Sequence, residues 1–189
     1  MQAKRTFREA GLEPIPGSDG LLATPEEAAR EADRAGYPVL LKATAGGGGR
    51  GMRLCRTPEE LARNYPAAVM EAEKAFGNGA LYLESFIESG RHIEFQVIGD
   101  VYGTVVCLGE RECSVQRNHQ KLLEESPSPV LSDELRWEMM DRVIGAIGRI
   151  GYVSAGTIEF LMDGRGRLYV MEMNTRIQVE HPVTEMVTG

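Results

Sequence analysis

The chain has 189 residues, of which 42% are hydrophobic and 26% are charged, and these globular values exclude a disordered or collagen-like chain. Lys and Arg number 21 against 28 Asp and Glu, and the formal net charge of −7 disfavours a surface that binds nucleic-acid phosphates. No apolar run approaches the roughly 18 residues of a membrane span, and the start lacks the apolar segment of a signal peptide, so we expect a cytoplasmic protein with no membrane partner.

Two helices are predicted by a repeated Thr-Pro-Glu-Glu signal. Thr24 and Thr57 are the N-caps, proline takes the first helical position, and glutamate takes the third. Glycines follow Ala35 and Phe76, where the helices should end. Short apolar runs at residues 38–43, 52–55 and 80–84 are typical of strands, and a first unit of two helices on a small sheet should end near residue 86.

A glycine-rich segment separates the first two of these strands and follows Lys42. Glycines let backbone N–H groups surround phosphate oxygens, and a nearby lysine adds positive charge. Walker and Rossmann loops both continue into a helix, whereas here a strand follows, so neither motif fits. A hairpin tip without a ligand is the alternative interpretation.

The second half of the chain begins with a strongly alternating strand at residues 91–98. Ile93, Phe95 and Val97 fall on one face, and His92, Glu94 and Gln96 fall on the other, which predicts a sheet with one polar face. Residues 104–108 extend this sheet, and Ser132 should cap a helix that ends near residue 150, with Trp137 in the core. Between them we expect a basic loop, solvated or ligand-binding, that carries Arg111, Gln116, His119 and Lys121.

A hairpin is predicted from residues 155–162 and 167–173, on either side of a Gly-Arg-Gly turn. Pairing that is symmetric about this turn places Glu159 opposite Glu172, and Asn174 lies two residues further along the same face. Three oxygen ligands of this kind suit Mg²⁺ held together with nucleotide phosphates, although a solvated acidic face would look similar. Arg176, between two glutamates, could hold a planar anion while a carboxylate accepts a proton, or the segment could be a surface strand.

The cysteines Cys55, Cys107 and Cys113 are expected to be free buried thiols, because their number is odd and their spacing is not that of a metal site. His92 and His119 also lack the ligand spacing of a zinc site, and hydrogen bonding to a sugar or phosphate suits them better.

Four segments together resemble biotin carboxylase, the ATP-grasp component of the biotin-dependent carboxylases: residues 42–52, 91–94, 116–121 and 172–181. The resemblance runs from about residue 10 to residue 189. It implies an α+β ATP-grasp fold in which residues 14–86 form the lid domain and residues 87–189 form the first part of the C-terminal subdomain. Residues 1–13 are then a linker.

The resemblance implies that Mg-ATP phosphorylates bicarbonate to carboxyphosphate, whose carboxyl group passes to biotin. Glu180 would be the general base, with Arg176 and Lys121 also catalytic. Bicarbonate would contact Lys121, Arg176, Gln178 and Val179. Glu159, Glu172 and Asn174 would bind Mg²⁺ or Mn²⁺. ATP would contact Lys42, Gly46, Gly47, Gly48, Gly49, Met52, Glu84, Ile87, His92, Gln116, His119 and Leu161.

The resemblance also implies partners and departures. Biotin would arrive on a carrier domain, since this chain has no Met-Lys-Met attachment motif, and a carboxyltransferase would complete an enzyme such as the acetyl-CoA carboxylase of fatty acid biosynthesis. The family's N-terminal Rossmann-like domain and its C-terminal part, with the biotin-site arginine, are not in this sequence, and Ala45 stands where many relatives have glycine. The alternatives are an ATP-binding fragment without turnover and another ATP-grasp carboxylate–amine ligase.

Overall fold

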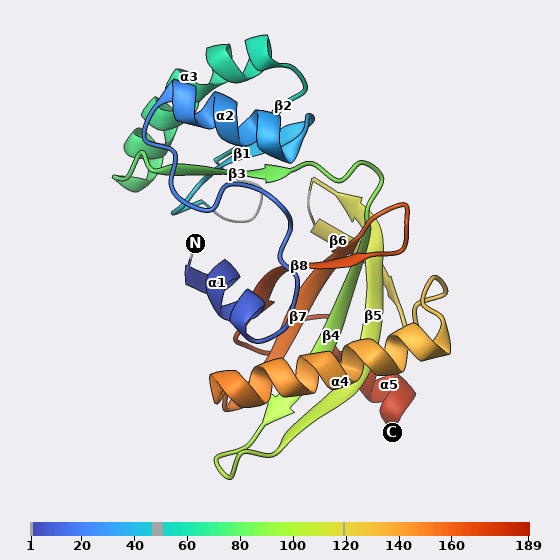
Figure 1. Ribbon diagram of the computed structural model, residues 1–189. Coiled ribbons are helices and arrows are strands. Elements are labelled where there is room, and N and C mark those ends of the chain that lie inside the picture. Colours follow the sequence, from blue (N-terminus) through green and yellow to red (C-terminus); the bar gives the residue numbers. More distant parts are fainter. Residues whose placement is uncertain (1, 47–50, 119) are drawn as a thin grey trace. The chain divides into compact units, whose positions relative to one another are not determined.

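A computed structural model describes residues 2–46, 51–118 and 120–189 (Figure 1). The chain forms two compact units, residues 15–87 and residues 2–14 together with 88–189. Each unit combines helices with an antiparallel sheet, which confirms the α+β class. Within the described residues, no helix is long and apolar enough to cross a membrane.

The first unit is a three-stranded sheet in the order β2-β1-β3, with β1 Val39–Ala43, β2 Met52–Cys55 and β3 Leu81–Ser85. Helices α2 (Pro25–Ala35) and α3 (Pro58–Phe76) supply the other half of its core. Both helices begin and end as the sequence predicts.

The helix signals have the predicted physical basis. Thr24 Oγ1 accepts a hydrogen bond from the Glu27 backbone N–H at 3.2 Å, and Thr57 Oγ1 accepts one from Glu60 at 3.3 Å. Gly77 ends α3 at φ 67°, a left-handed conformation that side chains disfavour.

The second unit is a five-stranded sheet in the order β6-β5-β4-β7-β8. The elements of this unit are α1 Gln2–Glu9, β4 Arg91–Gly99, β5 Val105–Arg117, β6 Gln120–Glu125, α4 Asp133–Ile150, β7 Ser154–Met162, β8 Leu168–Asn174 and α5 His181–Thr188.

Both faces of this sheet are covered. Ile93, Phe95 and Val97 are fully buried on the face against α4, where they pack with Met139 and Val143 (Figure 1). Glu94 and Gln96, on the opposite face, are also fully buried, because α5 packs against β5 there. The predicted polar face is therefore buried at Glu94 and Gln96, whereas Glu172 on the same face is exposed.

Three expectations are wrong. Residues 2–13 are not a linker, because α1 and the chain after it bury Phe7 and Leu12 in the core of the second unit. The segment after residue 108 is not a loop, since β5 runs on to Arg117 and β6 follows. Trp137 is not a core residue, because 62% of its surface is exposed. The cysteines are free thiols, and two of them, Cys55 and Cys113, are buried.

Candidate functional site

A row of charged residues crosses the polar face of the second unit's sheet. Arg111 on β5 pairs with Glu94 on β4, Glu94 pairs with Glu159 on β7, and Glu159 pairs with Glu172 on β8. Residues opposite one another on neighbouring strands share a face, and like charges in that position repel. The three glutamates, which we call the carboxylate row, therefore need cations nearby.

The predicted pairing of Glu159 with Glu172 is confirmed, but not the symmetry from which it was predicted. Nearer the turn, Phe160 pairs with Val170, so Met171 is an extra residue that forms a β-bulge. Asn174 lies beside this pair as expected, and its Nδ2 donates to Glu159 Oε1 at 2.9 Å.

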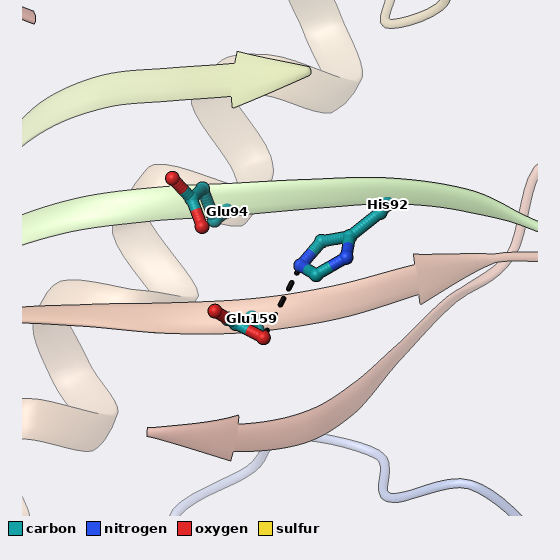
Figure 2. Close-up of side chains that lie close together, drawn as sticks. All are labelled: His92, Glu94 and Glu159. Carbon is teal, nitrogen blue, oxygen red and sulfur yellow. Dashed lines mark ion pairs between the residues drawn. The ribbon is translucent and has the colours of Figure 1, made fainter. Parts of the chain in front are cut away.

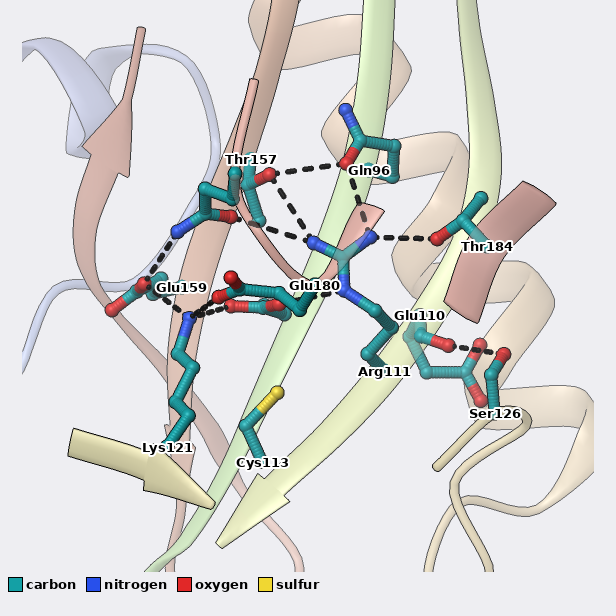
Figure 3. Close-up of polar contacts among 12 residues, drawn as sticks. Gln96, Glu110, Arg111, Cys113, Lys121, Ser126, Thr157, Glu159, Glu180 and Thr184 are labelled. Atoms are coloured by element: carbon teal, nitrogen blue, oxygen red, sulfur yellow. Dashed lines mark hydrogen bonds and ion pairs between the residues drawn. The ribbon is translucent and has the colours of Figure 1, made fainter. Parts of the chain in front are cut away.

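Lys121 is the cation that joins the carboxylate row to the segment after β8. Its Nζ donates to Glu94, to Glu159 Oε1 at 3.0 Å and to Glu180 Oε1 at 2.6 Å (Figure 3). Burial opposes the charge of Lys121, but these carboxylates outweigh that effect and raise its pKa. Burial likewise opposes the charge of Glu180, and Lys121 lowers the pKa of Glu180 below its ordinary value.

His92 is the second partner of Glu159. Its Nε2 lies 3.2 Å from Glu159 Oε2 (Figure 2). Its Nδ1 lies 2.8 Å from the side-chain nitrogen of Gln116. Burial raises the pKa of Glu159, but His92 and Lys121 more than offset it and lower the pKa to about 2. Glu159 is therefore ionised at neutral pH.

A cavity of about 690 Å³ opens beside these groups. The predicted site residues that line this cavity are His92, Gln116, Lys121, Glu159, Glu172, Asn174, Arg176, Gln178, Val179 and Glu180. Gln120, Glu124, Pro182 and Val183, which were not predicted, also line it. Leu161 lies opposite His92 on β7 and is not among the lining residues.

Two sets of side chains could supply ligands to a divalent cation. His92, Glu94 and Glu159 offer ligand atoms within 4.8 Å of one another (Figure 2), but Glu94 is fully buried and both of its oxygens are already paired, one with Arg111 and the other with Lys121. Glu172 and Asn174 lie on the other side of Glu159, and Glu172 is exposed towards the cavity. An ionised carboxylate, a second carboxylate and an amide oxygen fit Mg²⁺ or Mn²⁺.

Two residues of this charged network were given no role by the sequence analysis. The alternation of its strand placed Glu94 on the polar face together with His92 and Gln96. No role was assigned to Glu94 from that position. Arg111 was assigned to a basic loop, whereas its side chain is fully buried against Glu94, at 2.7 Å, and against Gln178.

The first unit brings together a smaller set of the predicted residues. Lys42 Nζ on β1 donates to Glu84 Oε2 on β3 at 2.9 Å, and it lies 5.5 Å from the centre of the Tyr82 ring. Burial disfavours the ammonium, but Glu84 and Tyr82 raise the pKa of Lys42. Met52 pairs with Lys42 across the β1–β2 ladder, and Ile87 is the last residue of the unit. Of the glycines, Gly46 is described, and Gly47, Gly48 and Gly49 lie outside the described residues, as does His119.

The cavity of the second unit combines acid–base and anion-binding groups. Glu180 is an ionised carboxylate next to an ammonium, and such a group can accept a proton from a ligand that Lys121 holds. Arg176 is exposed at the rim, where its Nη1 donates to the Ile177 carbonyl at 3.2 Å. Val179 is 94% exposed, so a ligand in the cavity can reach its backbone.

The chain was compared with known proteins. Residues 1–189 match the family model described as the carbamoyl-phosphate synthase L chain, ATP binding domain. The chain is 57% identical over 187 residues to biotin carboxylase 1, chloroplastic, of Populus trichocarpa. The aligned residues cover 99% of this chain and 35% of that protein. It is 59% identical over 188 residues to the 2-oxoglutarate carboxylase small subunit of Hydrogenobacter thermophilus, covering 100% of this chain and 40% of that protein.

Solved structures agree with these relatives. The biotin carboxylase domain of the Hydrogenobacter thermophilus enzyme, in complex with MgADP, ADP and bicarbonate, superposes with a TM-score of 0.93 at 59% identity and covers 98% of this chain and 41% of that one. The biotin carboxylase of Campylobacter jejuni, in complex with a β,γ-ATP ligand, gives a TM-score of 0.93 at 52% identity and covers 98% of this chain and 42% of that one.

The chain thus spans about two fifths of the length of these relatives. The α+β ATP-grasp fold is confirmed by their structures. The chain belongs to the family of carbamoyl-phosphate synthase L chain ATP-binding domains, and over its whole length it is similar to the ATP-grasp, ATP-binding portion of biotin carboxylases and of the biotin carboxylase subunits of related biotin-dependent carboxylases.

Proposed function

We propose that this chain carries the ATP-binding and bicarbonate-activating groups of a biotin carboxylase, which acts on bicarbonate and then carboxylates biotin. One observation carries the proposal: Lys121 joins an ionised Glu180 to the carboxylate row at a cavity that Arg176 and Gln178 also line. This arrangement supplies a base, a cation and N–H donors for a small anion that must lose a proton before it attacks phosphorus.

The roles follow the contacts of each unit. In the first unit, Lys42 is held by Glu84 with its charge intact, which suits it to a nucleotide phosphate. In the second unit, Glu159, Glu172 and Asn174 would hold Mg²⁺ or Mn²⁺, which supplies charge neutralisation for phosphoryl transfer when bound. His92 and Gln116, which contact each other, would serve the nucleotide.

Glu180 is the general base in this proposal. Because Lys121 keeps it ionised, it can take the bicarbonate proton, while Lys121, Arg176, Gln178 and the Val179 backbone would hold the anion. The carboxyl acceptor would be biotin on a carrier domain, with a carboxyltransferase as partner. A cytoplasmic location stays a prediction, since the similar proteins of Populus trichocarpa and Arabidopsis thaliana are named as chloroplastic.

The test measures Mg-ATP binding and phosphate release by the purified chain, with and without bicarbonate and free biotin. Bicarbonate-dependent release supports the proposal. Binding without release would favour the alternative of a nucleotide-binding fragment without turnover, and the absence of Mg-ATP binding by the folded chain would refute both.

The variant Glu180→Gln tests the base directly. We expect phosphate release to fall at least about 100-fold, a typical contribution of general-base catalysis, while the Kd for Mg-ATP stays unchanged. Glu185→Gln is the matched control, because Glu185 lies on α5 and is exposed, and within the described part of the chain its side chain has one ion-pair contact, from Oε1 to His181 Nε2 at 3.6 Å. Equal loss of nucleotide binding and release in Glu180→Gln would argue against the base role.

A further inference from the structure

One buried arginine connects four separate elements of the second unit. The side chain of Arg111 on β5 is fully buried. Its Nε donates to Glu94 Oε1 at 2.7 Å, its Nη1 donates to Gln96 Oε1 at 3.0 Å and Thr184 Oγ1 at 2.6 Å, and its Nη2 donates to Thr157 Oγ1 and Gln178 Oε1, both at 3.4 Å (Figure 3). A guanidinium has five N–H groups in one rigid plane, and all five have an acceptor here.

These contacts determine which way the amide of Gln178 faces. Arginine has only donors, so the carbonyl end of this amide must face Arg111. The Nε2 end then faces Glu159, whose Oε1 lies 3.3 Å away, and the cavity. Gln178 is 8% exposed, and a side chain so confined keeps the orientation that its partners impose.

Arg111 orients Glu94 in the same way. Arg111 holds one oxygen of this carboxylate, Oε1, and the other, Oε2, is left to accept from Lys121. Arg111 therefore contacts two residues that in turn contact the groups at the cavity, although it does not line the cavity itself.

We propose that Arg111 is a positioning residue of the anion site, which fixes the Gln178 amide with its N–H groups towards the cavity so that they can donate to bicarbonate. Only the identity of the anion rests on the proposed function. The orientation of Gln178 is a separate statement and can be tested without turnover.

The first experiment observes the amide itself. In the ¹⁵N-labelled full chain, the side-chain amide signals of Gln178 are assigned by their loss in Gln178→Ala. We expect these signals to move towards the values of a free glutamine in Arg111→Lys, because a single ammonium cannot reach both Glu94 and Gln178 in the plane of the guanidinium. Unchanged Gln178 signals in a folded Arg111→Lys variant would overturn the proposal.

Thr184→Val is the matched control. It removes one acceptor of Arg111 and leaves the contact with Gln178 in place. A lower melting temperature with unchanged Gln178 signals is expected, and this separates positioning from loss of stability. Signals that move as far in Thr184→Val as in Arg111→Lys would show that Arg111 has no specific role.

The second experiment measures bicarbonate. In Arg111→Lys we expect the bicarbonate concentration that half-saturates phosphate release to rise about tenfold, the loss of one hydrogen bond to a charged ligand, while the Kd for Mg-ATP is unchanged. In a Gln178→Ala background the same substitution should raise half-saturation by clearly less than tenfold, with only the contact through Glu94 and Lys121 remaining. Additive effects of the two changes would contradict action through Gln178.

Two outcomes are kept apart by this design. If wild-type release does not depend on bicarbonate, the proposed function fails, and the amide signals still decide the role of Arg111. If Arg111→Lys does not fold, the Nη2 protons of Arg111 report the same contact in the wild type and should shift in Gln178→Ala. The absence of such a shift would overturn the proposal.

Discussion

Replacing Lys121 by methionine removes the ammonium that Glu94, Glu159 and Glu180 share. Methionine keeps an unbranched apolar side chain that is one atom shorter, so the main change is electrostatic. Loss of one partner from a buried ion pair leaves an uncompensated charge, which is strongly destabilising. We expect the second unit to lose about 3 kcal/mol of its free energy of unfolding at pH 7.5.

The magnitude follows from Glu159. Lowering its pKa from 4.5 to about 2 corresponds to about 3 kcal/mol of stabilisation, and the Glu159 side chain is only 7% exposed, so solvent screens little of it. His92 supplies the larger share of the lowering and Lys121 the smaller, but the variant also leaves Glu94 and Glu180 without this cation, so the total stays at about this size. Because the folded-state pKa is lowered, this stabilisation is complete above pH 4.5 and is lost as the pH falls towards about 2.

The assay is urea denaturation at pH 7.5, 4.5 and 3.0, monitored by tryptophan fluorescence. Trp137 is the one tryptophan of the sequence and lies on α4, so this signal reports the second unit. The difference between variant and wild type should shrink as the pH falls. Lys74→Met, an exposed change in the first unit, is the control and should leave this transition within about 0.5 kcal/mol of the wild type. A loss below about 1 kcal/mol, or a difference that grows on acidification, would refute the reasoning.

Three further results are expected. Thr57→Ala removes the N-cap of α3 and should lower the unfolding free energy of the first unit by about 1 kcal/mol, measured by urea denaturation followed by circular dichroism. Lys42→Met should weaken Mg-ATP binding about tenfold or more in calorimetry, since it removes a charge held beside Glu84, and an unchanged Kd would exclude Lys42 from the nucleotide site. Burial raises the pKa of Cys107 to about 12 and raises that of Cys113, so neither thiol should react with a disulfide reagent at pH 8 until urea unfolds the chain, and rapid labelling of either would contradict this.

The parts of the fold that depend on local signals could be predicted from the sequence. The N-caps, the glycines that end α2 and α3, and the alternation of β4 each act within a few residues, and the elements begin and end close to where these signals place them. The pairing of Glu159 with Glu172 was also predicted, because hairpin arms must meet near their turn.

Arg111 shows why other parts could not be predicted. Simple alternation along β5 from Cys107 would put Arg111 on the same face as Cys107, against α4. A bulge changes this, since Val97 pairs with Cys107 while Phe95 pairs with Glu110, and β5 therefore has one extra residue near Gly109, which adopts φ 84°. The bulge shifts Arg111 to the face of Glu94, and the residue pattern of β5 does not predict the bulge.

The N-terminal segment was missed for a different reason. The run at residues 2–9 is short and polar, with Phe7 as its one aromatic residue, so it has too few apolar positions to predict a buried helix. Its burial depends on contacts with residues far along the chain, such as the hydrogen bond from Arg149 Nη1 to the Ala10 carbonyl at 2.8 Å. Long-range partners of this kind cannot be predicted from local sequence.

The bulge at Met171 affects how insertions and deletions can be tolerated along β8. Since Met171 is the extra residue between the Val170 and Glu172 pairs, deleting it leaves Glu172 opposite Glu159 in a regular ladder. Deleting Met173 instead would bring Asn174 opposite Ile158 and turn its amide to the other face of the sheet. If a relative lacks one residue at position 171, the pairing of Glu159 with Glu172 is therefore kept. If it lacks one at position 173 instead, Asn174 is turned away from that pair.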